Sequence, residues 1–360
     1  MKAWVLHGAD DIRFEDMEMP LLEASEVRVQ VKATGICGSD IPRIYETGAH
    51  RMPIVPGHEF SGVVTAVGKD ADPYWMGRRV GIYPLIPCGT CKPCMSGHPE
   101  MCRDYDYIGS RRDGAFAEYV SVPMGNLVEI PDSVSFEETA MLEPMAVVVH
   151  AMKRGIGADG ETSVVPADAR IVICGLGTIG LLLTMFLVDK GFRNIYVIGN
   201  KDSQRDKAID LGISEDDFCD SRSEDVSGWM REIVGGADVY FECVGRNECV
   251  SYGIDGMAPG GRVVLVGNPY SDMSLTKDTY WKILRNQLDV TGTWNSTFLQ
   301  RGYENPVTDD WGYVLNRLTE KKIKPDSLIT HRFDLADLDK GFSLMRNKSE
   351  PYVKVMMIQR

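Results

Sequence analysis

RIVICGLGTIGLLLTMFLVDK, residues 170–190, begins with an apolar run, continues through a glycine-rich turn and ends in a second apolar run. The first run indicates a buried strand, and the second indicates an apolar helix from about residue 178. The turn between them has the pattern G-x-G-x-x-G, with glycines at 175, 177 and 180. Because a strand precedes the pattern and a helix follows it, we predict dinucleotide binding rather than a tight turn without a ligand.

Each glycine of this loop has a physical task. Gly175 allows the tight turn, Gly177 lets backbone amides approach a pyrophosphate, and Gly180 lets the helix pack closely on the strand. The helix N-terminus then faces the anion. The predicted cofactor-binding loop consists of Gly175, Leu176, Gly177, Thr178, Ile179 and Gly180.

The region around the loop repeats the same alternation of buried runs and helices. Apolar runs at 194–199, 239–245 and 262–267 are separated by helical segments. This alternation predicts an α/β domain with a parallel, doubly wound Rossmann sheet. Ligands bind at the carboxyl edge of such a sheet. The residues expected to line the nicotinamide pocket there are Val266, Gly267, Asn268 and, more weakly, Thr293.

The end of the second strand bears on the choice between NAD and NADP. An acidic residue is expected there when the ribose 2′-hydroxyl of NAD is bound, but Gly199 occupies the position. Asn200, Lys201 and Arg205 follow it, and the two cations favour NADP. Two alternatives stay open: the cations are only solvated charges at the start of a helix, or the carboxylate of Asp202 allows NAD to be the cofactor.

The composition is that of a soluble globular enzyme with two domains. The chain has 360 residues, more than one compact core usually holds. Its net charge of −13 disfavours a nucleic-acid partner. No apolar run approaches the ~18 residues of a membrane helix, and the N-terminus shows no export signal. We therefore predict a cytoplasmic protein without a membrane or nucleic-acid partner.

The nine cysteines are interpreted first as metal ligands, because an odd number without an export signal disfavours a disulfide framework. PCGTCKPCMSGHPEMC, residues 87–102, holds four of them. Four thiolates at this spacing can close a tetrahedral cage around a structural Zn²⁺ and leave no position for a substrate. An iron–sulfur cluster is the alternative, although the last gap of seven residues differs from the ferredoxin pattern. The ligands of this four-cysteine loop would be Cys88, Cys91, Cys94 and Cys102.

Residues 1–150 have a different texture, with short alternating runs broken by glycine and proline. VRVQVKA, residues 27–33, alternates valines with polar residues as a half-buried strand does, so we expect an antiparallel, loop-rich β domain. In this region Cys37, His58 and Glu143 could form a zinc site with an open position. Taken singly, each has an ordinary explanation, and spacing alone cannot unite them.

Several motifs together resemble one family along the whole chain, the zinc-containing medium-chain alcohol and polyol dehydrogenases. Two segments, PRIYETGAH and YDYIGSRRDGAFAEY, are most similar to the polyol branch, which includes the sorbitol and galactitol-1-phosphate enzymes. The missing acidic residue at position 199 and a long connection at 155–168 depart from the family pattern. The motifs that carry the resemblance are GICGSD, GHEFSGVV, the four-cysteine loop, DGAFAEY, Glu143–Pro144 and GLGTIG.

The resemblance implies a domain order. A GroES-like catalytic domain with both zinc sites is expected at residues 1–153 and a Rossmann domain at 154–295. Residues 296–360 are expected to return to the catalytic domain. The family pattern also implies a homodimer or homotetramer.

The resemblance further implies two zinc ions per chain, one structural and one catalytic. The catalytic ligands are expected to be Cys37, His58 and Glu143, with Glu59 as an alternate ligand. Ser39 matches the family's hydroxyl relay for the substrate proton. Beside these residues, Asp40 is a candidate to support the ligands through a hydrogen bond.

The implied reaction moves a hydride between NAD(P) and a sugar alcohol or its phosphate, such as galactitol 1-phosphate, and yields the ketose. A phosphorylated substrate requires cations, and Arg43, His50, Arg111 and Arg112 are candidates, although surface arginines are often simply solvated. Three alternative functions are compatible with the motifs: an NADPH-dependent secondary-alcohol dehydrogenase or ketone reductase, a dehydrogenase of unphosphorylated sorbitol or xylitol, and a binding protein. The presence of all three catalytic ligands disfavours the last.

Overall fold

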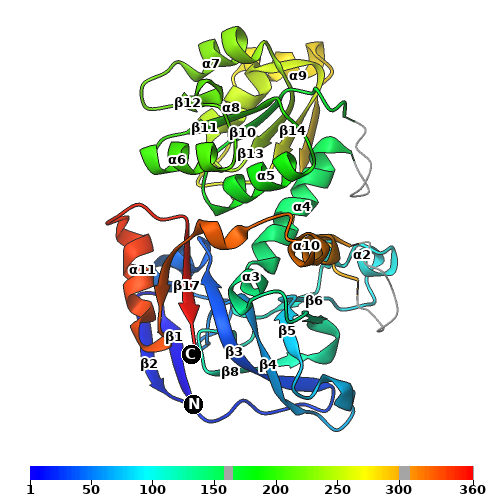
Figure 1. The fold of residues 1–360 in the computed structure, drawn as a ribbon, viewed down its shortest axis with the longest axis vertical. Helices are drawn as coiled ribbons and strands as arrows, with labels where there is room; N and C mark the ends of the chain where they lie inside the picture. The colour runs from blue at the N-terminus through cyan, green and yellow to red at the C-terminus, as the bar shows by residue number, and fades with distance from the viewer. Residues whose placement is uncertain (158–164, 300–308, 360) are drawn as a thin grey trace. The chain divides into compact units, whose positions relative to one another are not determined.

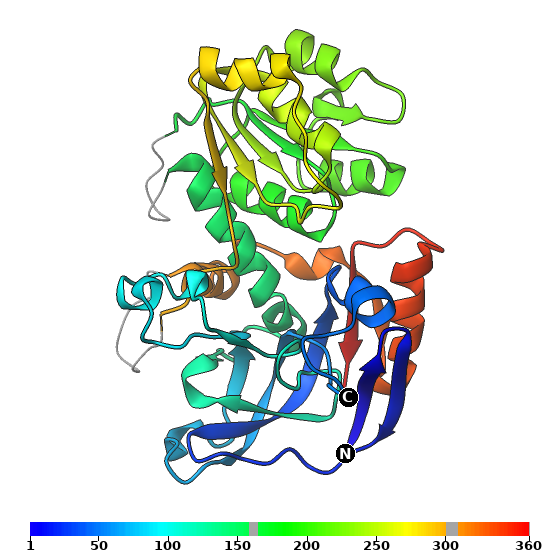
Figure 2. The same cartoon turned by 180° about the vertical axis from the view of Figure 1, so that it is seen from behind.

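The computed structural model describes residues 1–157, 165–299 and 309–359, and the chain divides into two compact units. One unit comprises Met1–Pro144 and Thr297–Arg360, and the other comprises Met145–Ser296 (Figures 1 and 2). Helix α4 (Leu142–Ile156) runs through the boundary that we expected at residue 153, so that boundary stays a prediction. Residues 158–164 of the long connection lie outside the described residues.

The Rossmann unit contains a six-stranded sheet with the order β12-β11-β10-β13-β14-β15, and every pair in it is parallel. The central strand β10 is buried along its whole length, as its continuous apolar run predicts. The predicted parallel sheet is therefore confirmed. Its strands are β10 (Ile171–Cys174), β11 (Ile195–Gly199), β12 (Phe218–Asp220), β13 (Ala237–Glu242), β14 (Met257–Leu265) and β15 (Asp289–Gly292).

Helices cover both faces of this sheet. Figure 1 shows α5 and α6 on one side of the sheet and α8 and α9 on the other. The strand order reverses between β10 and β13, so their carboxyl ends open a crevice where ligands bind in such sheets. The helices of this unit beyond α4 are α5 (Thr178–Asp189), α6 (Asp202–Asp210), α7 (Val226–Trp229), α8 (Asn247–Asp255) and α9 (Lys277–Arg285).

The other unit is built on a seven-stranded sheet with the order β16-β17-β3-β4-β5-β9, in which β8 also pairs with β3. All pairs are antiparallel except β16 with β17. The C-terminal strand β17 thus lies directly against β3 (Figure 1). The strands are β3 (Glu26–Ile36), β4 (Glu59–Val67), β5 (Arg79–Ile82), β8 (Tyr119–Pro123), β9 (Leu127–Glu129), β16 (Ile329–Phe333) and β17 (Lys354–Ile358).

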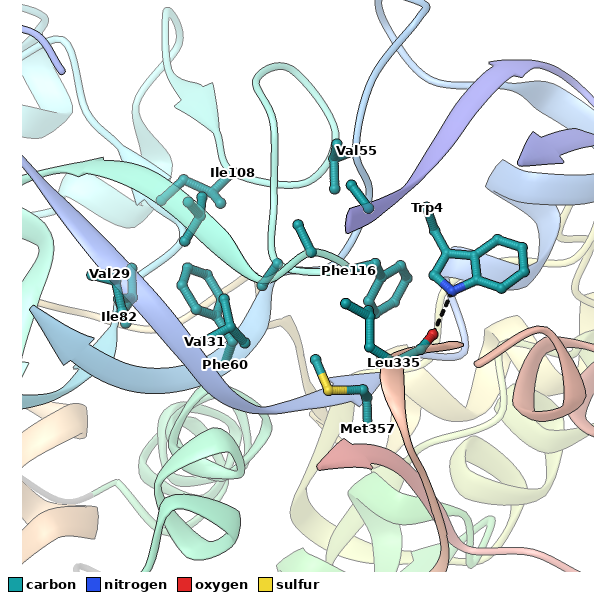
Figure 3. Close-up of a cluster of buried hydrophobic side chains, with 14 of the residues drawn as sticks. Trp4, Val29, Val31, Val55, Phe60, Ile82, Ile108, Phe116, Leu335 and Met357 are labelled. Atoms are coloured by element: carbon teal, nitrogen blue, oxygen red, sulfur yellow. Dashed lines mark hydrogen bonds between the residues drawn. The ribbon is translucent and has the colours of Figure 1, made fainter. Parts of the chain in front are cut away.

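The core of this unit comes from the apolar face of the sheet. Val29 and Val31 of β3 are fully buried while the polar residues between the valines are partly exposed, which confirms the predicted alternation. Figure 3 shows these valines beside Phe60, with Met357 of β17 also in the cluster. At its rim Trp4 donates a hydrogen bond of 2.7 Å from Nε1 to the carbonyl of Leu335. Burial of this cluster fixes β3 and β17, the two strands that border the site described below.

Short elements complete this unit. Among the residues that the structure describes, no helix combines the length and apolar character that crossing a membrane requires. The remaining strands are β1 (Lys2–Gly8), β2 (Asp11–Asp16), β6 (Leu85–Ile86) and β7 (Asp106–Tyr107), and the helices are α1 (Asp40–Pro42), α2 (Lys92–Met95), α3 (Phe136–Ala140), α10 (Asp310–Thr319) and α11 (Leu338–Asn347).

Candidate metal centres and cofactor site

The four-cysteine loop brings its sulfur atoms together. Sγ of Cys91 lies 3.4 Å from Sγ of Cys94 and 3.8 Å from Sγ of Cys102, and all four sulfurs, including that of Cys88, lie within 4.8 Å of one another. A regular tetrahedron with Zn–S bonds of ~2.3 Å has sulfurs about 3.8 Å apart. The donor set and its spacing therefore fit a closed zinc cage.

Support for these thiols comes from the loop's own backbone. The N–H of Cys91 donates to Sγ of Cys88 at 3.4 Å, and the N–H of Cys88 donates to Sγ of Cys102 at 3.3 Å. Backbone N–H donors of Thr90 and Cys91 lower the pKa of Cys88 to about 6, whereas burial and the neighbouring sulfurs raise the pKa of Cys94 to about 12. A thiol whose anion already accepts N–H bonds is prepared for metal binding.

A second set of ligand atoms gathers at the edge of the β sheet. Cys37, His58 and Glu59 each offer one atom within 4.8 Å of the other two, and we call these three residues the Cys37 site. Cys37 follows the end of β3, and Glu59 begins β4, which pairs with β3 so that Gly35 lies opposite Glu59. This antiparallel pairing explains how segments twenty residues apart deliver ligands to one place. His58 and Glu59 are buried, and Cys37 is half-buried.

Asp40 lies behind the Cys37 site and contacts two of its members. It is fully buried, accepts the N–H of Cys37 at 3.0 Å and lies 3.5 Å from Nδ1 of His58. Burial would lower the pKa of His58, but the charge of Asp40 and the bonds to Asp40 and Cys37 raise it well above its usual value. Nδ1 of His58 has no closer hydrogen-bond partner among the described residues. A carboxylate that faces one ring nitrogen favours the ring orientation in which the other nitrogen binds a metal.

Glu143 lies near the Cys37 site but does not belong to the mutually close set. It is in the first turn of α4, where it accepts a hydrogen bond of 3.3 Å from the hydroxyl of Tyr107. The ring of Tyr107 in turn packs edge-on against His58, with centroids 5.8 Å apart. Burial raises the pKa of Glu143 to about 7, with the charge of Glu59 acting in the same direction and that of His58 against it. Glu143 is therefore close enough to Glu59 and His58 for their charges to act on it.

Lys354 is a neighbour of the site that the sequence analysis missed. It lies on β17, is 2% exposed, and forms an ion pair with Glu59. Its Nζ also donates to the carbonyl of Ile36 at 3.2 Å. The available signal was a lone lysine in an otherwise apolar final strand, because such a charge is buried only where an acidic partner meets it.

A pocket of about 360 Å³ opens next to the Cys37 site. Ser39 forms part of its wall and donates a hydrogen bond of 3.2 Å to Sγ of Cys37. The guanidinium of Arg43, also in the wall, lies 2.5 Å from a carboxylate oxygen of Asp40. Two of the four predicted substrate cations thus share one pocket with the predicted hydroxyl relay. The lining residues are Ser39, Pro42, Arg43, Thr47, Gly48, Ala49 and His50.

The other two substrate candidates lie on the turn that follows β7. The N–H of His50 donates to the carbonyl of Ser110 at 3.3 Å, so this turn borders the pocket loop. Arg111 lies over the ring of Tyr105, 4.5 Å from its centroid, and its buried Nε has no hydrogen-bond partner in the described part of the chain. Arg112 instead forms an ion pair with the buried Glu26 of β3. This contact makes Arg112 part of the β domain's framework.

The glycine loop of the Rossmann unit has the geometry that its pattern predicts. Gly175 has a φ of +95°, a backbone conformation that residues with a side chain rarely adopt. A Cβ on Gly180 would lie 1.9 Å from the carbonyl oxygen of Gly175, so only glycine lets α5 begin so close to the strand. A Cβ on Gly177 would meet no described atom within 4 Å beyond its own neighbours. The space above Gly177, at the N-terminus of α5, fits an approaching pyrophosphate.

The end of β11 is crowded on one side and charged on the other. A Cβ on Gly199 would lie 2.9 Å from the ring of Phe218. Arg222, a residue that the sequence analysis missed, lies across from it, with its guanidinium 2.6 Å from Asp220 and 2.5 Å from Asp202. Arg205 lies 3.8 Å from Glu215. Arg222 is therefore paired with carboxylates next to the end of β11, and position 199 itself carries no carboxylate.

The expected nicotinamide-side residues lie at the carboxyl edge of the sheet. Val266 and Gly267 follow β14, and both donate N–H bonds of 2.9 Å to the carbonyl of Glu242, the last residue of β13. A Cβ on Gly245 would lie 1.8 Å from the carbonyl oxygen of Asn268, so these turns are tightly packed. The roles assigned to Val266, Gly267, Asn268 and Thr293 stay predictions.

The two units together define a class of protein. A Rossmann sheet with a glycine loop occurs here in one chain with a β domain that holds a closed four-sulfur set and a separate cysteine–histidine–carboxylate set. That combination is that of a zinc-dependent alcohol dehydrogenase that uses a nicotinamide dinucleotide.

Comparison with known proteins identifies the family. Residues 23–132 match the alcohol dehydrogenase GroES-like domain, and residues 178–311 match the zinc-binding dehydrogenase domain. The chain is 35% identical over 335 residues to galactitol 1-phosphate 5-dehydrogenase from Escherichia coli, and the aligned region covers 92% of each protein. The chain belongs to the zinc-containing medium-chain alcohol and polyol dehydrogenases, as its motifs predicted.

Solved structures agree with this fold. The chain is similar to galactitol-1-phosphate dehydrogenase from Escherichia coli, with a TM-score of 0.87, 31% identity and complete coverage of both chains. It is also similar to a zinc-binding dehydrogenase from Sinorhizobium meliloti bound to NADP, with a TM-score of 0.87, 27% identity and 99% coverage of both chains. A dehydrogenase from Escherichia coli complexed with NADH gives a TM-score of 0.88, with 26% identity and coverage of 100% of this chain and 99% of that one. Both forms of the cofactor thus occur among similar proteins.

Proposed function

We propose that this dehydrogenase oxidises a secondary hydroxyl of a sugar alcohol phosphate to the ketone and catalyses the reverse reduction. The observation that carries the proposal is the pocket beside the Cys37 site, whose wall contains Arg43 and His50 together with Ser39. Cations in a pocket suit a phosphate group, because a phosphate that leaves water must be paired. The similarity to galactitol 1-phosphate 5-dehydrogenase points to the same class of substrate.

The residues of the chain suit this chemistry. Bound zinc supplies a Lewis acid for the substrate oxygen, and bound nicotinamide accepts or supplies the hydride. Cys37 and His58, with Glu143 or Glu59, would hold the zinc. Ser39, whose hydroxyl contacts Cys37, would pass the substrate proton from the site toward solvent. In the four-cysteine loop a second zinc would only hold the loop folded.

A kinetic comparison tests the substrate. We expect kcat/KM for galactitol 1-phosphate to exceed that for galactitol. Arg43→Met should reduce kcat/KM for galactitol 1-phosphate about tenfold more than it reduces kcat/KM for galactitol, which is the usual effect of one charge-assisted hydrogen bond. Arg51→Met is the matched control, since Arg51 lies outside the pocket wall and is 56% exposed. Equal kcat/KM for the two substrates would rule out the phosphate site and favour an unphosphorylated polyol or a simple secondary alcohol.

We further propose that NADP is the preferred cofactor. Position 199 carries no carboxylate that would repel a 2′-phosphate. Arg222 lies two residues beyond Asp220, the residue that pairs with Gly199 across β11 and β12, and Arg205 lies in α6, which follows β11. We expect Arg222→Ala to lower the ratio of kcat/KM for NADP over NAD by roughly tenfold. Arg231→Ala, on an exposed arginine of the same unit, should leave the ratio unchanged. A wild-type ratio below one would show that NAD is preferred.

The assembly and location of the protein are proposals as well. Large apolar side chains of α9 are exposed, among them Tyr280, Trp281 and Leu284, and β15 is an edge strand of the Rossmann sheet. Such a surface favours a homodimer or homotetramer, and light scattering on the protein as it elutes from a size-exclusion column would measure its mass.

All nine cysteines are described and free, which suits the reducing cytoplasm that we propose as the location of the protein.

A further inference from the structure

Lys354 is a buried cation beside the Cys37 site, and the chemistry described so far assigns it no task. Its ammonium contacts a carboxylate oxygen of Glu59 and the carbonyl of Ile36, and only 2% of the residue is exposed. A buried ammonium is costly unless it is paired, and Glu59 is its paired acid.

The backbone around this pair is shaped to hold it. Gly35 of β3 lies opposite Glu59 on β4 and opposite Met356 on β17. A Cβ on Gly35 would lie 2.2 Å from a carboxylate oxygen of Glu59 and 2.6 Å from Cε of Lys354. The missing side chain therefore makes the space in which the carboxylate and the ammonium meet.

Two carboxylates, those of Glu59 and Glu143, lie near this site. Glu59 belongs to the close set with Cys37 and His58, whereas Glu143 lies outside that set and accepts a hydrogen bond from the neutral hydroxyl of Tyr107. One thiolate and one carboxylate balance the charge of a divalent ion. A second carboxylate on the ion would add an excess negative charge and fill a further ligand position.

We propose that Lys354 selects which carboxylate binds the catalytic metal. By pairing with Glu59 it withholds that carboxylate and leaves the position to Glu143, so that the metal keeps a position for the substrate. Lys354 is thus a positioning residue that acts through Glu59. This inference rests on the proposed role of the Cys37 site as the catalytic zinc site.

Cobalt substitution of the full-length protein tests the proposal, because Co²⁺ replaces Zn²⁺ and its visible spectrum reports the number of ligands. In Lys354→Met, which keeps the chain length without the charge, Glu59 is free to bind. We expect weaker visible bands from the Cys37 site, release of its cobalt to a chelator slowed by about tenfold, and kcat lowered by roughly 10–100-fold, the range for residues that support ligands. Cobalt in the four-cysteine loop provides the internal reference.

Three further variants separate the outcomes. Lys340→Met, on an exposed lysine of α11, should match the wild type. Glu59→Gln alone should change the rate of cobalt release by less than about threefold. The double variant with Glu59→Gln and Lys354→Met should have the wild-type spectrum again. Faster release or an unchanged spectrum in Lys354→Met would overturn the proposal and leave the lysine a structural role.

The Glu59→Gln variant decides the matter even where Lys354→Met fails to fold. If Glu59 is withheld in the wild type, Glu59→Gln costs little cobalt affinity, because the amide oxygen can still accept a hydrogen bond from Lys354. A loss of about tenfold or more would show that Glu59 is itself a ligand, which contradicts selection by Lys354. The assignment of the site is tested separately, since Cys37→Ala must abolish the cobalt bands that do not belong to the four-cysteine loop. If those bands persist, the proposed catalytic site is wrong, whatever Lys354 does.

Discussion

The four-cysteine loop and the Cys37 site both hold thiols close to other ligand atoms, but they are built in different ways. The loop takes all its ligands from fifteen consecutive residues and its support from their own N–H groups. The Cys37 site takes Cys37 and Glu59 from two strands and is buttressed by Asp40 and Lys354. A local set of four identical ligands closes around a metal. A distributed set with spare carboxylates can hold a metal and still admit a substrate.

The largest effect is expected from removing a ligand of the distributed set. Cys37→Ala or His58→Ala should lower kcat/KM by at least about 10³-fold, because the Lewis acid is lost with its ligand. Metal analysis should find one zinc per chain instead of two, and circular dichroism should be unchanged. Two zincs per chain in either variant would show that these residues are not ligands and would remove the functional contrast between the two sets.

A smaller effect is expected from a residue that supports the distributed set without binding metal. Asp40→Asn keeps the size of the side chain but removes the charge that faces His58 and Arg43. We expect zinc affinity at the Cys37 site to fall by roughly 10–100-fold, because supporting carboxylates orient the imidazole. Competition with a chelator measures this affinity.

Asp132→Asn is the matched control, since Asp132 pairs with Arg79 at the surface and is 99% exposed. Unchanged zinc affinity in Asp40→Asn would mean that the buried contacts around His58 are not needed for metal binding. The distributed set would then depend on its own ligands alone, as the loop does.

The sequence alone predicted the parts of the molecule whose signal is local. The glycine loop and the strand before it are a single pattern, and the structure bears out both the turn at Gly175 and the close packing at Gly180. The four cysteines are close in sequence and are therefore close in space. The parallel sheet followed from its buried runs, because strands covered on both faces have no polar side.

The distributed site could not be predicted from spacing in the same way. Its members meet because β3 pairs with both β4 and β17, and strand pairing over such separations depends on the whole domain. The family resemblance supplied Cys37, His58 and the two glutamates. Lys354 could not be predicted because a single charge in a strand has no pattern of its own. Arg222 could not be predicted because it follows β12, one strand beyond the end of β11 where the ribose-binding residue is expected.

The smallest effect on turnover is expected from opening the four-cysteine loop. Cys94→Ser removes one of four ligands, so the loop should lose its zinc while the Cys37 site, whose ligands lie at the adjoining ends of β3 and β4, keeps its own. We expect the melting temperature to fall by about 5 °C or more, since each kcal/mol lost shifts it by roughly 2–4 °C in a domain of this size. The kcat/KM of the folded protein should stay within about threefold, because a closed cage contacts no substrate.

Thr90→Val is the matched control within the loop. It removes only a hydroxyl that lies 3.7 Å from Sγ of Cys88 and keeps the backbone N–H that supports this sulfur. Metal content and melting temperature should therefore match the wild type. A loss of kcat/KM beyond about tenfold in Cys94→Ser, with the second zinc retained, would contradict the division of labour between the two sets. The conformation of the loop would then affect turnover at the Cys37 site, and a closed set of four ligands would not by itself show that a metal is purely structural.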